Sequence, residues 1–116
     1  MRFLIFLILC PAAYACDVEG DGETLYSRYY EIAYKETGKD ESGQRTSEAR
    51  ILNQEQAKLA HSCLLQAAEK NSCSAHYMLS FYYQHGNFGS NIPITKNEAL
   101  AQQFNESSKT YCKGNT

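Results

Sequence analysis

Cysteines are the side chains of this chain with the most reactive chemistry. The 116 residues include five cysteines. Removal of an N-terminal leader that carries Cys10 would leave four of them, Cys16, Cys63, Cys73 and Cys112. An even number of cysteines in a short exported chain is typical of a disulfide set, because oxidising compartments favour the bond. The cysteines therefore predict two disulfides.

Helix geometry favours one pairing of these four cysteines. Cys73 is expected at the start of one helix and Cys112 at the end of the next, and antiparallel neighbours bring such ends together. Their Cα atoms can then approach to the roughly 4.4–6.8 Å that a disulfide requires. Cys16–Cys63 follows by elimination, with the N-terminal segment folded back along a helix. Each bond is expected to contribute about 2–4 kcal/mol, mainly by restricting the unfolded chain.

The histidines and cysteines do not form a pattern typical of catalysis. His61, His76 and His85 occur without an HExxH motif, a Gly-x-Ser-x-Gly elbow or a phosphate-binding glycine loop. The cysteines lack CxxC spacing and a tight Cys/His cluster, so no metal site and no cofactor is predicted. The expectation is a protein that is not an enzyme.

Tyrosines are the residues best suited to binding a partner. Nine are present, and seven fall in two predicted helices, over 23–37 and 74–85. Tyrosine provides a large contact area at low entropic cost and is enriched at interaction hot spots. The predicted partner-binding set is Tyr26, Tyr29, Tyr30, Tyr77 and His76. Tyr26, Tyr29 and Tyr77 are expected to be the exposed contacts, whereas half-buried packing is the alternative for Tyr30, Tyr34, Tyr82 and Tyr83.

The first half of the chain is expected to hold two helices. Asp21 can cap the first, which should run over 23–37 and end at Gly38. Residues 38–48 are wholly polar and glycine-bearing, which predicts an exposed loop. A second helix should then begin near residue 49 and run to about residue 70.

The second half of the chain is expected to hold two further helices. The third should span 74–85 and lead into a loop over 86–95. Thr95 with Glu98 forms a capping box for the fourth helix, which should run to about Tyr111. Nowhere do apolar residues alternate over several positions, so no strand is predicted.

The apolar residues of these helices follow a helical period and recur. Ala75, Leu79 and Tyr82 stand at i, i+4 and i+7, the spacing of one helix face. At an offset of 40 residues, Ala60 aligns with Leu100, Leu64 with Phe104, and Ala67-Ala68 with Ser107-Ser108. A period of that size is typical of helical solenoids, in which hairpins stack on one another.

These residues resemble the Sel-one-like repeat, a subgroup of the tetratricopeptide-like family. Its pattern is a helix ending in Ala-Ala-Glu-x-Gly, a hinge, and then Ala-x-x-x-Leu-Gly-x-x-Tyr-x-x-Gly. The chain has Ala67-Ala68-Glu69-Lys70-Asn71, and then Ala75, Leu79-Ser80, Tyr83 and Gly86. The clear repeat covers about 60–108, and a degenerate unit covers about 22–70.

The resemblance implies an all-α fold of two stacked antiparallel helical hairpins, a short α-solenoid. The first helix of each hairpin would line a concave face, which here carries the tyrosines. Asn71 and Ser80 stand where the family has glycine, and Ser107-Ser108 stand where it has alanines. Serines keep the packing close, but their buried hydroxyls need hydrogen-bond partners.

Residues 1–15 are typical of an export signal. Arg2 supplies the positive start, an apolar run follows, and Ala13-Tyr14-Ala15 offers small residues for cleavage. The apolar run is shorter than the about 20 residues that span a bilayer. Cleavage after Ala15 would leave 16–116 as one domain, periplasmic or secreted. Cys16 would then come first, and a lipid on Cys16 is the alternative that would attach the protein to a membrane.

Charge and motifs together favour a protein partner. The net charge of −2 provides no basic patch for nucleic acid. The expected function is a protein–protein interaction module, an adaptor or regulator that holds its partner on the tyrosine-rich face. One alternative is an immunity protein that covers the active site of a secreted toxic effector. A second follows from the resemblance: cysteine-rich Sel-one-like proteins carry β-lactamase and penicillin-binding names, although this chain lacks Ser-x-x-Lys.

Overall fold

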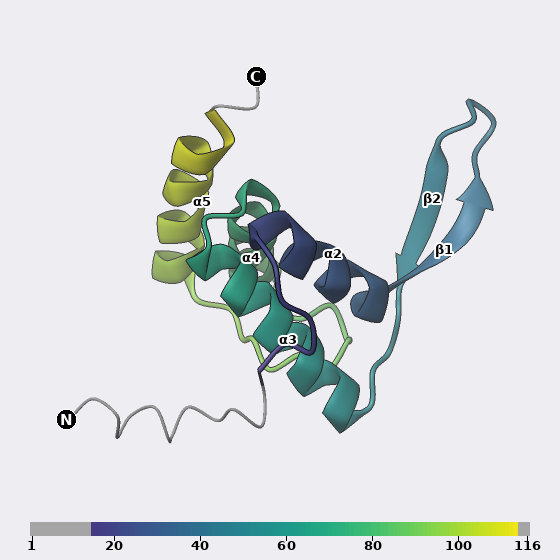
Figure 1. Cartoon of the computed structure of the whole chain (residues 1–116), viewed down its shortest axis with the longest axis horizontal. Coiled ribbons are helices and arrows are strands. Elements are labelled where there is room, and N and C mark those ends of the chain that lie inside the picture. The colour runs from purple at the N-terminus through teal and green to yellow at the C-terminus, as the bar shows by residue number, and fades with distance from the viewer. Residues whose placement is uncertain (1–14, 114–116) are drawn as a thin grey trace.

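A computed structural model describes residues 15–113, so the expected export signal, apart from Ala15, lies outside the described residues. The described part contains four helices and a two-stranded antiparallel sheet (Figure 1). The elements in chain order are α2 (Gly22–Ala33), β1 (Tyr34–Lys39), β2 (Arg45–Ala49), α3 (Gln54–Glu69), α4 (Cys73–His85) and α5 (Glu98–Cys112).

The helices form two antiparallel pairs, α2 with α3 and α4 with α5. Glu23 at the start of α2 accepts a hydrogen bond from Ser72, just after the end of α3. In the second pair, the backbone N–H of Asn97, which precedes α5, donates to the carbonyl of Tyr83 near the end of α4. Helix α4 also packs against both α2 and α3, so the two pairs share one core.

The β-hairpin corrects the expected all-α class. The first helix was expected over 23–37, but it ends at Ala33, and residues 34–39 pair with residues 45–49. Both strands are largely exposed, so no alternation of apolar and polar residues marked them. Figure 1 shows the hairpin projecting from the helical body. The prediction that the chain has no strand is therefore wrong.

The hairpin turn is built around Asp40. Its carboxylate accepts hydrogen bonds from the backbone N–H groups of Ser42 and Gln44 and from the Ser42 hydroxyl. These donors lower the pKa of the Asp40 carboxyl, because they stabilise its charged form. Gly43 follows with φ 88°, a conformation that favours glycine. Of residues 38–48, which were expected to form an exposed loop, only 40–44 form this turn, and the others belong to the two strands.

The starts of α3 and α5 differ from the expected ones. Asn53 caps α3, and its side chain and that of Gln56 form a capping box. Helix α3 therefore begins at residue 54, five residues after the expected position, because β2 occupies the preceding segment. Asn97, and not Thr95, caps α5, with its side chain accepting from the backbone N–H of Leu100.

The departures from the repeat pattern have local explanations. Asn71 adopts φ 64°, the left-handed conformation that favours glycine or asparagine after a helix. The hydroxyl of Ser80 donates to the carbonyl of Tyr77. Ser107 and Ser108 likewise donate to carbonyls three residues earlier in α5. The buried hydroxyls thus have the partners that they were expected to need.

Two disulfides join the pairs expected from the sequence. The Cys16–Cys63 bond, with Cα atoms 4.5 Å apart, attaches the N-terminal segment to α3. The Cys73–Cys112 bond, with Cα atoms 4.8 Å apart, ties the start of α4 to the end of α5. Both bonds are those of a protein from an oxidising compartment. Among the described residues, no helix combines the length and the apolar character needed to cross a membrane.

Candidate functional site: an aromatic surface

The two helix pairs meet at a buried pair of tyrosines. Tyr29 of α2 and Tyr82 of α4 are 0% and 2% exposed, and their hydroxyls lie 2.6 Å apart. Their rings meet edge to face, with centroids 6.4 Å apart. Burial raises the pKa of both phenols, so both stay neutral. The prediction that Tyr29 is an exposed contact is wrong, because its helix face packs into the core together with Leu25 and Ala33.

A row of tyrosine rings continues outward from this pair along α2. The ring of Tyr26 lies 5.4 Å from that of Tyr29 and 6.2 Å from that of Tyr30. Tyr30 stacks on Tyr34, the first residue of β1, at 4.5 Å. The Tyr30 hydroxyl lies 2.7 Å from that of Ser47 in β2, so the β-hairpin extends the row. Tyr26 is half-buried, and burial raises the pKa of its phenol.

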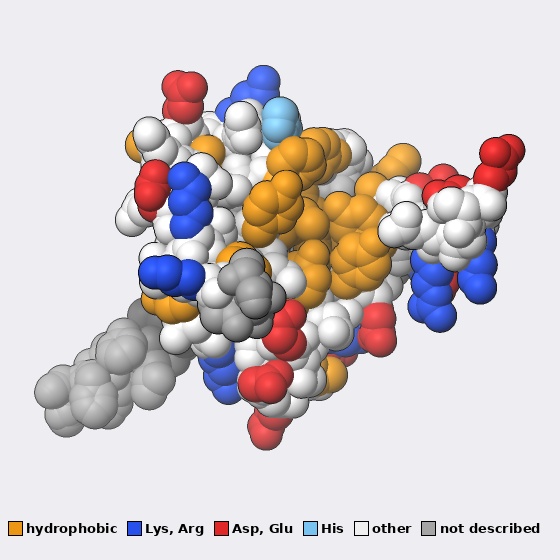
Figure 2. Space-filling view, turned by 90° about the horizontal axis from the view of Figure 1, so that it is seen from above, with side chains coloured by type: hydrophobic (Ala, Val, Ile, Leu, Met, Phe, Trp, Pro, Cys, Tyr) orange, Lys and Arg blue, Asp and Glu red, His pale blue; other side chains and the backbone are white. Residues whose placement is uncertain are grey.

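Aromatic residues on α4 and the following loop continue the row on the other side of the tyrosine pair. Tyr77 and Phe81 stand one helical turn apart on α4, 58% and 39% exposed. The Phe81 ring lies 5.2 Å from that of Phe88, which lies 5.4 Å from that of Tyr82. We define the aromatic surface by its six outer members, Tyr26, Tyr30, Tyr34, Tyr77, Phe81 and Phe88. Figure 2 shows hydrophobic side chains gathered into a patch beside the β-hairpin.

The sequence prediction missed the two phenylalanines. Phe81 could have been found from its helical spacing with Tyr77. Phe88 follows the end of α4 and adopts φ 56°, a conformation that its residue type does not favour. The side chain of Asn87 holds this loop by donating to the carbonyl of Ile92 and accepting from the N–H of Gly89. That arrangement depends on the folded loop and has no simple signature in the sequence.

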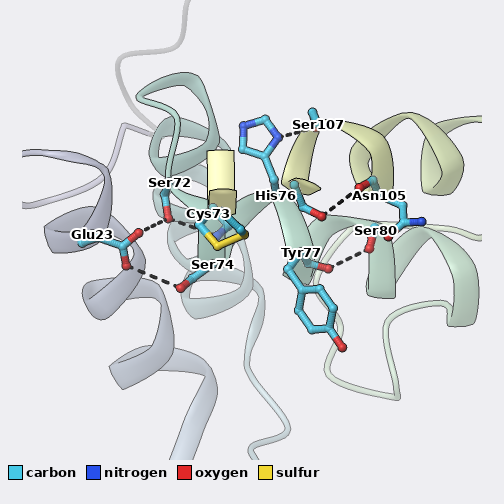
Figure 3. The surroundings of a disulfide bond; sticks show 12 residues. Glu23, Ser72, Cys73, Ser74, His76, Tyr77, Ser80, Asn105 and Ser107 are labelled. Carbon is cyan, nitrogen blue, oxygen red and sulfur yellow. Dashed lines mark hydrogen bonds between the residues drawn. A yellow bond between two sulfur atoms is a disulfide. The ribbon is translucent and has the colours of Figure 1, made fainter. Parts of the chain in front are cut away.

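His76 was also predicted as a partner contact, and the structure places it inside the fold. It is 8% exposed, and its Nε2 lies 2.9 Å from the carbonyl oxygen of Ala68 in α3. Because a carbonyl accepts only, Nε2 must carry the proton. Its Nδ1 lies 2.6 Å from the hydroxyl of Ser107 in α5. Figure 3 shows His76 reaching Ser107, whereas the Tyr77 ring points elsewhere. His76 therefore joins three helices.

Two grooves flank the aromatic surface. One lies between α4 and α5, with a volume of about 660 Å³, and takes Tyr77 and Phe81 as part of its lining. The other, of about 600 Å³, lies between α2 and the β-hairpin and includes Tyr30 and Tyr34. Arg45 lines this second groove and forms an exposed ion pair with Glu36. Hydrogen-bonding and charged groups thus border the aromatic rings on both sides.

One cluster of metal-ligating residue types occurs among the described residues. Cys16, Asp17 and Cys63 bring their ligand atoms within 4.8 Å of one another. The two sulfur atoms form a disulfide, so neither is a thiolate that could bind a metal. The Asp17 carboxylate instead accepts two hydrogen bonds from the guanidinium of Arg28, which lower the pKa of its carboxyl. The cluster is therefore a structural attachment of the N-terminal segment.

Comparison with known proteins gives no identification. No protein-family model matches the chain, and neither a curated protein nor a solved structure matches it. The Sel-one-like resemblance therefore stays a prediction.

Proposed function

We propose that the chain is a non-catalytic domain that binds a partner protein on the aromatic surface after export to an oxidising compartment. The observation that carries this proposal is the continuity of the surface. Six aromatic side chains from α2, β1, α4 and the following loop are joined by ring contacts and helical spacing, and a buried tyrosine pair supports them.

The chemistry of the surface suits a protein. Aromatic residues supply most of the energy at protein interfaces, and partly exposed rings such as Tyr30 and Tyr77 offer both apolar faces and hydroxyls. The surface also stands on a fixed frame, because one disulfide attaches the N-terminal segment to α3 and the other joins α4 to α5. A frame that is already ordered loses less conformational entropy on binding than a flexible one. Both features favour a folded partner held as an adaptor or a regulator would hold it.

Capture experiments with the oxidised domain, residues 16–116, test the proposal. The domain would be immobilised and exposed to periplasmic extract of the native host, and the captured protein would then be purified for titration. Tyr30→Ala and Tyr77→Ala should each weaken binding by about 1–3 kcal/mol, the range for hot-spot aromatics. Ile51→Ala is the matched control, because Ile51 is 82% exposed and lies outside the aromatic surface.

Three outcomes would contradict the proposal or redirect it. Retained binding in both tyrosine variants would place recognition elsewhere. Inhibition of a captured toxic enzyme would replace the adaptor role with the immunity role. Turnover of nitrocefin by the oxidised domain, above that of a Cys→Ser variant, would replace binding with β-lactam hydrolysis.

A further inference from the structure

The groove between α4 and α5 has a lining that could accommodate a third helix. Tyr77 and Phe81 make one wall, on α4, and Gln102 and Asn105 line the wall on α5. Small residues line it between the walls: Ser80 and Ala101 are each 8% exposed. Small residues between two helices allow a third backbone to approach closely, as the ridges-into-grooves packing of helices requires.

The first helix pair has a corresponding wall, and α4 lies against it. Positions 51 residues apart relate Tyr26 to Tyr77, Tyr29 to Ser80, and Tyr30 to Phe81. In the first pair, Tyr29 contacts Tyr82 of α4. Glu23, one turn before Tyr26, accepts hydrogen bonds from Ser72 and Ser74 at the start of α4. Tyr77 and Phe81 thus stand on α4 where Tyr26 and Tyr30 stand on α2, on either side of the position that contacts α4 in the first pair.

The opposite side of the groove, on α5, carries small residues, as α3 does in the first pair. Ala68 of α3 accepts a hydrogen bond from His76 of α4. Forty residues further on is Ser108 of α5, and Ala101 stands two turns before it on the same helix face. Ser108 is 5% exposed, as close to buried as Ala101. Small residues thus occur on both α3 and α5, Ala101 lines the groove, and none of the described elements fills it.

We propose that this groove binds one amphipathic helix of a partner protein, parallel to α4, in the position that α4 takes on the first helix pair. The inference rests on the proposed protein-binding function and names the element that is bound. By analogy with Ala75, Leu79 and Tyr82 of α4, the bound helix carries a small residue, a leucine and an aromatic residue at i, i+4 and i+7. Ser80 in place of Tyr29 leaves room for a large side chain opposite it.

Charge sets the orientation of the bound helix. Among the described residues that line the groove, Glu98 is the one with a charge. It lies at the start of α5, beside the end of α4, where Asn97 contacts Tyr83. A helix parallel to α4 would therefore place its last turn near Glu98. Lysine or arginine in that last turn would interact favourably with both the carboxylate and the helix dipole.

A second copy of the chain does not suit the groove. The face of α2 that corresponds to the packing face of α4 consists of Thr24, Ser27, Arg28 and Glu31. Arg28 forms ion pairs with Asp17 and Glu31 on this face. Insertion of α2 from another copy would bury these charges in the groove at a cost. The polar face closes one end of the two-pair stack, which leaves the α4–α5 end for a different protein.

A synthetic helix tests the groove directly. The probe is a peptide with the sequence of residues 74–85 of this chain, followed by two lysines and labelled for fluorescence anisotropy. Titration into the ¹⁵N-labelled oxidised domain should shift the amide signals of Tyr77, Phe81, Gln102 and Asn105. Ala101→Leu, which fills the groove, should weaken peptide binding at least tenfold, whereas Ile51→Ala should leave it unchanged. Circular dichroism would establish that the Ala101→Leu domain is folded.

A charge exchange provides the second arm of the test. Glu98→Lys should weaken binding of the lysine-ended peptide about two- to fivefold, as expected for an exposed ion pair. A peptide ending in two glutamates should recover that loss on the Glu98→Lys domain. Recovery would support the parallel orientation, and its absence would overturn that part of the proposal.

Three results would overturn the groove while leaving the proposed function intact. One is a titration in which the peptide shifts the amide signals of α2 and the β-hairpin and leaves those of the groove unchanged. Another is a captured natural partner that is lost with Tyr30→Ala but retained with Ala101→Leu. The third is the absence of any peptide binding up to millimolar concentration.

Discussion

The two helix pairs share an arrangement but differ in the kinds of side chain that they bury. The first pair and α4 bury large side chains completely, among them Tyr29, Leu64 and Leu79. Helix α5, in contrast, buries Ala101 and Ser108, with Phe104 only partly buried. Burial of apolar area is the main stabilising contribution to folding, at about 25 cal/mol per Å². The comparison indicates that α2, α3 and α4 supply most of the buried apolar area, whereas α5 adds little of it.

Helix α5 is held instead by polar contacts and a covalent bond. His76 links it to α3 and α4 through Ser107, and Cys112 binds it to Cys73. Polar contacts of this kind fix geometry more than they add free energy, since each net hydrogen bond contributes about 1 kcal/mol. Helix α5 can therefore keep its position against α4 although it buries little apolar surface.

Substitutions at corresponding positions of α3 and α5 should have the largest effects and test whether the two helices contribute unequally to stability. Leu64→Ala in α3 should lower the free energy of unfolding by about 2–5 kcal/mol, because it leaves a cavity in a fully buried site. Phe104→Ala, 40 residues further on in α5, should cost about 1–2 kcal/mol, because its side chain is only partly buried. Urea unfolding of the oxidised variants would measure both. Equal losses would contradict an unequal contribution of the two helices.

Removal of each disulfide in turn should show which helix depends on which bond. Cys16→Ser/Cys63→Ser and Cys73→Ser/Cys112→Ser should each cost about 2–4 kcal/mol. The two variants should loosen different segments of the fold. Without Cys73–Cys112, hydrogen exchange should accelerate in α5 more than in α3, because α5 buries little apolar area. Mass spectrometry of exchanged peptides would locate the change. Faster exchange in α3 alone would argue against a covalently held α5.

The tyrosine pair between the two helix pairs allows a smaller test. Tyr29→Phe removes the hydroxyl contact with Tyr82 and should cost about 1 kcal/mol. The double variant with Tyr82→Phe should cost less than the sum of the single variants, since neither hydroxyl is then left without the other. Additive losses in unfolding experiments would show that the hydrogen bond does not couple the helix pairs.

The smallest expected effect concerns pH. His61 lies in α3 at the position that Ala101 takes in α5, and burial lowers the pKa of its imidazole. Protonation therefore disfavours the folded state: this contribution to stability is present above the usual histidine pKa of about 6.5 and is lost as pH falls through the lowered value. His61→Gln should lose less stability than the natural chain between pH 7.5 and 5. Identical pH dependence would exclude His61 as its source.

The helices were predictable from sequence because their signals are local. Apolar spacing located α4 to within one residue, and antiparallel pairing correctly predicted Cys73–Cys112. The β-hairpin was not predictable in this way. Its strands lie outside the core, so no apolar residue had to alternate, and a Thr37–Thr46 side-chain contact between the strands carries no signal along the chain.

The residues predicted for the candidate site can be compared with the structure only in their exposure. Tyr30 and Tyr77 are exposed, as a contact residue must be, and Tyr26 is half-buried. Tyr29 and His76 are core residues instead. Helical spacing tells which face of the helix a residue lies on, but it does not tell which other element packs against that face. Phe88 joins the surface through the folded shape of its loop, which sequence spacing does not encode.

The bond between Cys73 and Cys112 makes the groove between α4 and α5 dependent on the oxidation of these two cysteines. In the reducing environment where a chain is synthesised, the end of α5 has no covalent attachment to α4, and its small buried area holds it weakly. One wall of the groove is then free to separate from the other. Formation of the disulfide fixes the two walls together, so a defined groove requires oxidising conditions. A reduced chain would keep the aromatic surface, to which α5 contributes no member, but would lack a fixed second wall for the groove.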